Sequence, residues 1–226
     1  MTIGQLERET QNNVVQRLQS ILGYDYLGNR TDRSHNSCIE TSIARTYLDK
    51  YYPDVLVTKA LDELVKTADD QSKSLYDRNK EVYRMLRYGI KVREELGENK
   101  QTVWLIDWKN PHNNHFAFAE EVTVTGKHDK RPDIVLYVNG IALGVLELKR
   151  STVSVSEGIR QNLDNQKKDF IGHFFSTIQL VMAGNDTQGI RYGTIETPEK
   201  YYLEWKEPSE ITHPLHKHLV QLCEPT

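Results

Sequence analysis

Hydrophobic and polar positions from the N-terminus to about residue 88 repeat with the period of an α-helix. In the segment 3–22, one stripe at about 100° per residue holds six apolar side chains before Gly23: Ile3, Leu6, Val14, Leu18, Ile21 and Leu22. The same period, together with start and stop residues, predicts further helices at about 36–51, 55–69 and 74–88. The first 88 residues are therefore expected to be mainly helical.

From residue 89 the pattern changes to that of β-strands. Runs rich in β-branched and aromatic residues, separated by turn formers, predict seven strands, at 101–108, 115–125, 134–138, 141–148, about 177–183, about 189–195 and about 200–206. Asn139-Gly140 is typical of a tight hairpin turn, because both residues accept a positive φ. Ser154 and Glu157 have the spacing of a capping box, which predicts a helix to about Phe170.

These elements predict an α/β fold with a central mixed sheet flanked by helices. The helical region at about 36–88 is expected to be inserted before a sheet-rich core at about 89–206, and a short C-terminal helix follows. With 226 residues, 38% of them hydrophobic, the chain can bury a core of its own, most simply as one domain over 1–226, although two small lobes are allowed.

Several classes of protein are disfavoured by the composition. No run of eighteen apolar residues and no apolar N-terminal signal segment occurs, so we expect neither secretion nor a membrane span. Cys38 and Cys223 match no metal-binding or paired-thiol spacing, which favours a cytoplasmic setting. The net charge of −3 does not indicate nucleic-acid binding by the chain as a whole, so any DNA contact must use a local basic patch.

The residues that indicate chemistry lie in the segment 131–150. Asp133 precedes one predicted strand, the turn at 139–140 reverses the chain, and Glu147 and Lys149 lie near the end of the returning strand. Side chains at i and i+2 share a face of a strand, and the hairpin brings Asp133 beside both. Two close carboxylates repel each other unless a cation lies between them, so a hard ion such as Mg²⁺, with Mn²⁺ as a substitute, is expected there.

This set of side chains indicates phosphodiester hydrolysis. A metal ion held by Asp133 and Glu147 would activate water and neutralise charge on a phosphate, and Lys149 would orient the water or stabilise the same charge. The simpler alternative is that Asp133 caps a strand while Glu147 and Lys149 form an ordinary ion pair. Three rival tripeptides, beginning at Glu98, Asp107 and Glu204, lack a second acid on one short hairpin.

Pro132-Asp133, thirteen further residues and then Glu147-x-Lys149 resemble the signature of PD-(D/E)xK nucleases. The continuation to Gln161, the opening 7–15, the hairpin 134–144 and the segment 193–202 are similar to the N-terminal part of the restriction subunit (HsdR) of type I restriction–modification enzymes. The resemblance covers nearly the whole chain. It implies a restriction-endonuclease-like fold and a DNA-cleaving domain that precedes an ATP-driven motor.

The resemblance also implies partners, namely DNA and the modification and specificity subunits of the restriction complex. No GxxxxGK[ST] phosphate loop occurs, so ATP is expected to bind only to the full-length subunit. Two alternatives stay open: a repair or junction-cutting nuclease with the same signature, and a non-catalytic docking domain.

Further site residues follow from the resemblance. Such nucleases often add an acid from the first helix, and the helical phase favours Glu7 over Glu9 as a metal ligand. They often carry Q-x-x-x-Y after the lysine; Gln161 takes the glutamine position, but Asn165 stands at the tyrosine position, and Gln166 is a competing choice.

Basic residues surround the predicted site. Eight lysines and arginines against seven acids give residues 121–170 a net charge of only about +1. Arg131 and Arg150 flank the chemical residues, so they are the predicted phosphate contacts, with Gln161 as a further DNA-binding residue.

Overall fold

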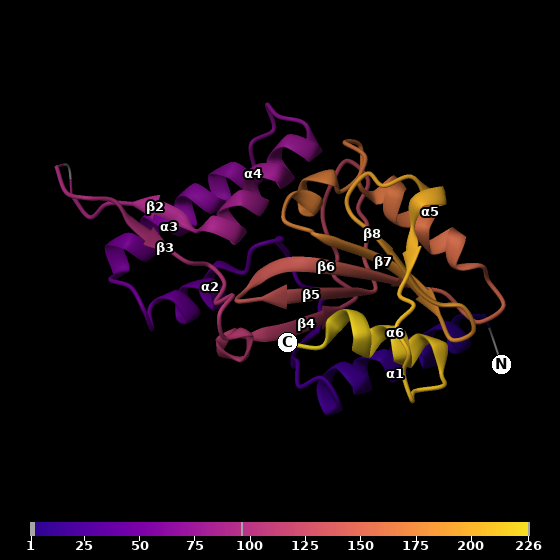
Figure 1. The fold of residues 1–226 in the computed structure, drawn as a ribbon. Coiled ribbons are helices and arrows are strands. Elements are labelled where there is room, and N and C mark those ends of the chain that lie inside the picture. The colour runs from indigo at the N-terminus through magenta and orange to yellow at the C-terminus, as the bar shows by residue number, and fades with distance from the viewer. Residues whose placement is uncertain (1–2, 96, 226) are drawn as a thin grey trace.

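The computed structural model describes residues 3–95 and 97–225, with side chains from residue 7 onward. Its centre is a seven-stranded mixed sheet (Figure 1). The strands lie in the order β1 (Asp25–Asn29), β4 (Phe116–Glu120), β5 (Ile134–Val138), β6 (Ile141–Leu148), β7 (Leu180–Asn185), β8 (Gly189–Gly193) and β9 (Leu203–Glu204). The pairs β1–β4 and β6–β7 are parallel, and the other pairs are antiparallel. The predicted α/β class with a central mixed sheet is confirmed.

Helices cover both faces of this sheet. On one face, α1 (Ile3–Ser20) and α6 (Pro214–Cys223) lie side by side (Figure 1) and bury Leu18 and Leu219 against Leu146 and Leu148. On the other face, α5 (Val155–Asn165) connects β6 to β7 and packs on both strands. This arrangement follows from strands that are apolar on both sides, since each face needs its own cover.

The predicted helical region forms a layer beside the sheet. It contains α2 (Thr41–Leu48), α3 (Asp54–Ala68) and α4 (Leu75–Tyr88), and a two-stranded sheet, β2 (Ile90–Val92) with β3 (Gln101–Val103), extends from it. Asn79 of α4 donates from Nδ2 to three backbone oxygens in 175–178, which ties α4 to the short helix η2 (Gly172–Ser176). None of the helices in the described part has the length and apolar character that a membrane span requires, and both cysteines are buried free thiols.

Two strands were not predicted. The segment 1–88 is mainly helical in its described part, but it also contains β1 at 25–29, which joins the central sheet. The core predicted from residue 89 begins instead with β2 and β3, which pair with each other outside the main sheet. The two strands that were not predicted, β1 and β2, have only five and three residues, so neither shows a clear alternating pattern.

Other elements are shorter than predicted. The helix expected at about 36–51 begins at Thr41, because residue 38 hydrogen-bonds to Ala142 and Ile39 bridges Ile141. The strand expected at 101–108 ends at Val103. In the first helix, Ile21 is 62% exposed because the helix ends at Ser20. The side chains of Ile3 and Leu6 lie outside the described residues.

The capping residue of α5 is confirmed, but the predicted box is not formed as expected. Ser154 is the N-cap, and its hydroxyl accepts from the backbone N–H of Ser156. The Glu157 carboxylate pairs with Arg160 at 3.0 Å. The helix ends at Asn165, short of the predicted Phe170.

The predicted hairpin turn is confirmed and holds several elements together. Asn139 and Gly140 have φ values of 49° and 78°. A Cβ on Gly140 would lie 2.7 Å from the Glu40 carbonyl oxygen, so only glycine permits this approach of α2. Asn139 is 1% exposed, and its side chain links the turn to residues 105, 114 and 115 by hydrogen bonds of 2.7–2.9 Å.

We expect Asn139→Ala to lower the free energy of unfolding by about 2–4 kcal/mol, because it leaves buried polar groups without partners and because alanine adopts positive φ less readily than asparagine. Urea denaturation measures the change. Asn139→Gly is the matched control for the backbone, since it relieves the φ penalty but also loses the hydrogen bonds. Equal stability of wild type and both variants would contradict this account of the turn.

Candidate active site

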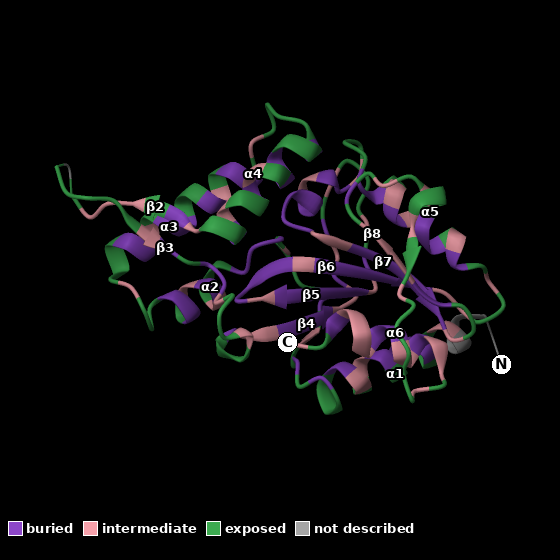
Figure 2. Cartoon of the chain, in the orientation of Figure 1, coloured by how far each residue is buried: buried purple, intermediate pink, exposed green. Residues whose placement is uncertain are grey.

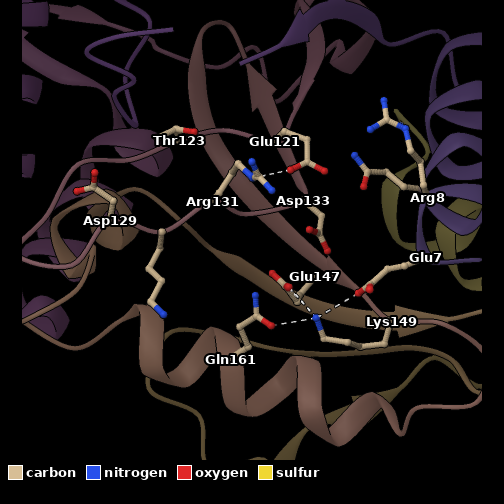
Figure 3. A pocket seen from close by; sticks show the side chains of 12 residues that line it. Glu7, Arg8, Glu121, Thr123, Asp129, Arg131, Asp133, Glu147, Lys149 and Gln161 are labelled. Carbon is tan, nitrogen blue, oxygen red and sulfur yellow. Dashed lines mark hydrogen bonds and ion pairs between the residues drawn. The ribbon is translucent and has the colours of Figure 1, made fainter. Parts of the chain in front are cut away.

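Strand register brings the two predicted acids together at one end of the β5–β6 hairpin. Ile134 pairs with Leu146, so the next position in the antiparallel register sets Asp133 opposite Glu147. Lys149 follows just beyond the end of β6. Asp133 and Glu147 point into one pocket with Lys149 (Figure 3), which has a volume of about 600 Å³. The structure therefore places all three predicted catalytic residues side by side.

The two carboxylates differ in their surroundings. Asp133 opens onto the pocket, and its Oδ2 accepts a hydrogen bond of 2.6 Å from the backbone N–H of Leu148. Glu147 is 2% exposed, and its Oε1 accepts from Lys149 Nζ at 2.9 Å. The other oxygen, Glu147 Oε2, is buried without a hydrogen-bond partner among the described residues. An unpaired buried carboxylate oxygen is costly, so a missing cation or donor is the simplest physical explanation.

The ammonium group of Lys149 joins three elements. Besides Glu147, it donates to Gln161 Oε1 on α5 at 2.9 Å and lies 3.6 Å from Glu7 Oε1 on α1 (Figure 3). Glu7 comes from the helix on the opposite face of the sheet, at the end where the strands stop. The structure therefore brings both residues suggested by the resemblance, Glu7 and Gln161, to the lysine.

The competing glutamine lies elsewhere. Gln166 is buried, donates to the Asn162 carbonyl oxygen and accepts from the backbone N–H of Glu196. Asn165, at the position where a tyrosine was expected, is 1% exposed and lies in the core. Gln161 is thus the glutamine that reaches the site.

Close packing of α5 sets the position of Gln161. A Cβ on Gly158 would lie 3.1 Å from the Ala183 side chain and 3.5 Å from Glu147 Cγ. The absence of a side chain at 158 therefore lets the first turn of α5 approach β6 and β7 closely. Gln161 follows three residues later on the same helix, on the side that faces Lys149.

Electrostatics of the site favour uptake of positive charge. Burial, reinforced by the charge of Asp133, raises the pKa of Glu147 from 4.5 to about 8. Burial likewise raises the pKa of Asp133 to about 6, although the Leu148 N–H and Lys149 oppose the change. Burial alone would lower the pKa of Lys149, but the carboxylates around it raise it. Lys149 therefore stays protonated, whereas ionisation of the two acids is unfavourable in the folded chain.

Glu121 is a further acid at the pocket that was not predicted from the sequence. Glu120 pairs with Ile134, and the backbone N–H of Glu121 donates to the Asp133 carbonyl oxygen at 2.8 Å. Glu121 has φ 52°, and its side chain forms an ion pair of 2.6 Å with Arg131. The strand predicted over 115–125 ran straight through this residue, so nothing in the pattern marked its bend.

The predicted phosphate contacts are placed differently from each other. Arg131 lines the pocket, although it is paired with Glu121, whereas Arg150 is half-buried and is not one of the lining residues. Lys130 and Arg8 also line the pocket. The rival acid Asp107 is held in its own loop by two backbone N–H groups and Asn113, which makes it part of a turn.

A metal ion at this site would have few protein ligands. Among the described residues, no group of three or more His, Cys, Asp or Glu side chains is arranged to hold a metal. The free oxygens of Asp133 and Glu147 are the available pair, and Mg²⁺ commonly binds through one or two carboxylates while it keeps several waters. The pocket is lined by five acids and four cations, formally −1, so a divalent ion would make it attractive to a phosphate.

Comparison with known proteins places this architecture in context. The model of the HSDR_N family, described as type I restriction enzyme R protein N terminus, matches residues 4–200. The type I restriction enzyme HindI endonuclease subunit of Haemophilus influenzae is 28% identical in an alignment that covers 90% of this chain and 20% of that protein. The SauMSSORF170P endonuclease subunit of Staphylococcus aureus is 25% identical over 81% of this chain and 19% of its own length. The chain thus spans about a fifth of the curated relatives it matches.

The raised pKa of Glu147 gives a pH dependence that can be measured in the metal-free chain. The folded chain holds the proton of Glu147 more tightly than the unfolded chain does. The stability that this proton contributes is fully present below the unfolded pKa of 4.5, and it is lost as the pH rises through about 8. Glu147→Gln stays neutral, so we expect it to gain stability relative to wild type between about pH 5 and 9, on the order of 2–4 kcal/mol.

Urea denaturation in EDTA at several pH values tests this expectation. Glu63→Gln, an exposed carboxylate on α3, is the control and should follow wild type at every pH. Parallel profiles for wild type and Glu147→Gln would contradict the electrostatic account.

Proposed function

Because the chain belongs to the family of type I restriction enzyme R protein N termini, we propose that it is the DNA-cleaving domain of a type I restriction enzyme. The reaction is hydrolysis of a phosphodiester bond with Mg²⁺ as cofactor, and Mn²⁺ can substitute. The observation that carries the proposal is the convergence of Asp133, Glu147 and Lys149, with one buried oxygen of Glu147 left unpaired.

Each residue has a role in this mechanism. Asp133 and Glu147 would hold the metal, which lowers the pKa of bound water and neutralises charge on the phosphate. Lys149 stays protonated and donates hydrogen bonds to the attacking water or to a phosphate oxygen as charge grows there. Gln161 and Glu7 position its ammonium group, and Glu7 can also serve as an additional metal ligand. Water adds to phosphorus, and the bond to the leaving oxygen breaks.

DNA would contact the rim of the pocket. Arg131 is the best-placed cation there, and its ion pair with Glu121 fixes the guanidinium at the pocket. Gln161 can keep its Oε1 on Lys149 while its Nε2 donates to DNA. Arg150 would have to contact DNA outside the pocket.

The rest of the enzyme is proposed from the relatives. They are named as endonuclease subunits and are about five times as long as this chain. We propose that the full-length subunit carries an ATP-driven motor, that it acts in the cytoplasm against foreign DNA, and that it assembles with modification and specificity subunits. A repair or junction-cutting nuclease is disfavoured by the family match, and a docking domain gives no reason for clustered acids.

We expect Mg²⁺ to bind the wild-type chain weakly, because only two protein oxygens are available, and binding should be lost in Asp133→Ala and Glu147→Ala. Isothermal titration calorimetry with Mg²⁺ or Mn²⁺ measures it. Asp107→Ala is the matched control and should bind as wild type does. Unchanged binding in both site variants would refute the metal site.

The proposed function is tested by Lys149→Ala in the full-length subunit within its complex. We expect DNA cleavage to fall at least about a hundredfold, the size of a lost transition-state contact, while ATP hydrolysis stays near wild type. Lys206→Ala belongs to a rival tripeptide and should leave both activities intact. Normal cleavage by Lys149→Ala would overturn the assignment.

A further inference from the structure

The exposed side of α4 and the loop after β3 carry aromatic side chains interleaved with cations. Six aromatic side chains here are between 45% and 65% exposed: Tyr51, Tyr76, Tyr83, Tyr88, Trp104 and Trp108. Four exposed cations lie among them: Lys80, Arg84, Arg87 and Lys109. We call these ten residues the aromatic–basic face. It includes two of the three tryptophans in the chain.

The face is continuous along α4. Tyr76, Lys80, Tyr83 and Arg87 are spaced by three or four residues, so they form one stripe on the helix. This stripe lies beside the buried side of α4, and Figure 2 shows the exposed turns of the helix in green. Rings that stay about half exposed stabilise the fold less than buried rings do, so two of them on one stripe with two cations suggest a ligand.

Arg87 connects the stripe to a pocket. Its guanidinium lies 5.5 Å from the centre of the Trp108 ring, and Trp108 Nε1 donates to the Leu86 carbonyl oxygen at 2.8 Å. The pocket, of about 450 Å³, is lined by Arg87, Trp108, Trp104 and Tyr51, together with other residues. That volume lies in the range of small-ligand sites, roughly 300–1,000 Å³.

The cations of the face are available to an anion. None of the four forms an ion pair with an acid in the described part of the chain. Of the nearby acids, Asp77 accepts from the Ser74 hydroxyl, Glu81 pairs with Lys73, and Glu63, which lines a pocket with Arg84, forms no ion pair with it. Asp107 lines the pocket but is held by its own loop, so the pocket suits a ring better than a phosphate.

We propose that the aromatic–basic face binds single-stranded DNA, with bases stacked on the rings and phosphates against the cations. Stacking on protein aromatics needs bases that are free of a duplex, whereas a positive surface alone would serve either form. A protein partner fits less well, because lysine is depleted in protein interfaces, and here Lys80 and Lys109 lie among the rings. The Lys80 ammonium, 5.7 Å from the Tyr76 ring, would exchange the ring for a phosphate on binding.

This face is separate from the candidate active site. Asn139, at the turn of the β5–β6 hairpin, donates to the Leu105 carbonyl oxygen, next to Trp104, while Asp133 and Glu147 lie at the other end of the hairpin. The length of β5, about 17 Å, therefore lies between them. The proposal does not depend on the cleavage mechanism.

Fluorescence anisotropy tests the proposal with a labelled oligothymidylate of about fifteen nucleotides, in EDTA and at low salt, against a duplex of equal length. We expect the 226-residue chain to bind the single strand more tightly and to show quenched tryptophan fluorescence at saturation. Because no metal or cleavage is involved, the result is independent of the nuclease assignment.

Variants identify the surface. Tyr83→Ala and Arg84→Glu remove exposed groups with no hydrogen bond, ion pair or ring contact in the described part, so folding should persist, and each should weaken binding at least about fivefold. Tyr201→Ala is the matched control, because Tyr201 is 59% exposed with Lys200 4.8 Å from its ring, and it should bind as wild type. Equal affinity for duplex, no quenching, no binding, or unchanged binding by both variants would overturn the proposal.

Discussion

A carboxylate buried beside a second carboxylate is the constraint on which the catalytic end of this molecule depends. Glu147 is 2% exposed and lies across the strand register from Asp133. Such a pair cannot be stabilised by packing, because each negative charge raises the cost of ionising the other. The surrounding structure supplies compensation instead: the Lys149 ammonium bonds to one acid and the Leu148 N–H to the other.

Three elements are held in place by this charge requirement. Glu147 alone would not fix the position of the Lys149 ammonium group. Gln161 from α5 and Glu7 from α1 hold it from two further sides. Gly158 allows the helix approach that makes the first of these contacts possible. The site is therefore a junction between both helical layers and the strand ends, and a shift of any one element would alter the geometry at the lysine.

The sequence was sufficient where the determining relation is local. The thirteen residues between Asp133 and Glu147 contain a two-residue turn with positive φ, so spacing predicted that the two acids lie close together. Their direct opposition depends on a register shift between Leu136 and Tyr137, because a regular two-residue hairpin would set Asp133 opposite Leu146. Helical phase similarly selected Glu7. The phase argument could not choose between Gln161 and Gln166, because the answer depends on how α5 rotates against the sheet. Glu121 and β1 depend on pairing between distant segments, which leaves no periodic signal.

The charge distribution explains why whole-chain composition gave little indication of DNA binding. The net charge of −3 is a sum over two different surfaces. In the pocket the acids outnumber the cations, whereas on the helical face the cations are not paired with acids. At the pocket, Arg131 and Lys149 are paired with carboxylates and the acids outnumber the cations, so a bound divalent ion would supply the attraction for a phosphate. The cations of α4 named above form no ion pair with an acid, and no acid cluster that could hold a metal lies there among the described residues. Separation of these two roles lets a mildly acidic chain contain both an anion-repelling metal site and a surface suited to nucleic acid, because exposed charges more than about 10 Å apart are largely screened from each other.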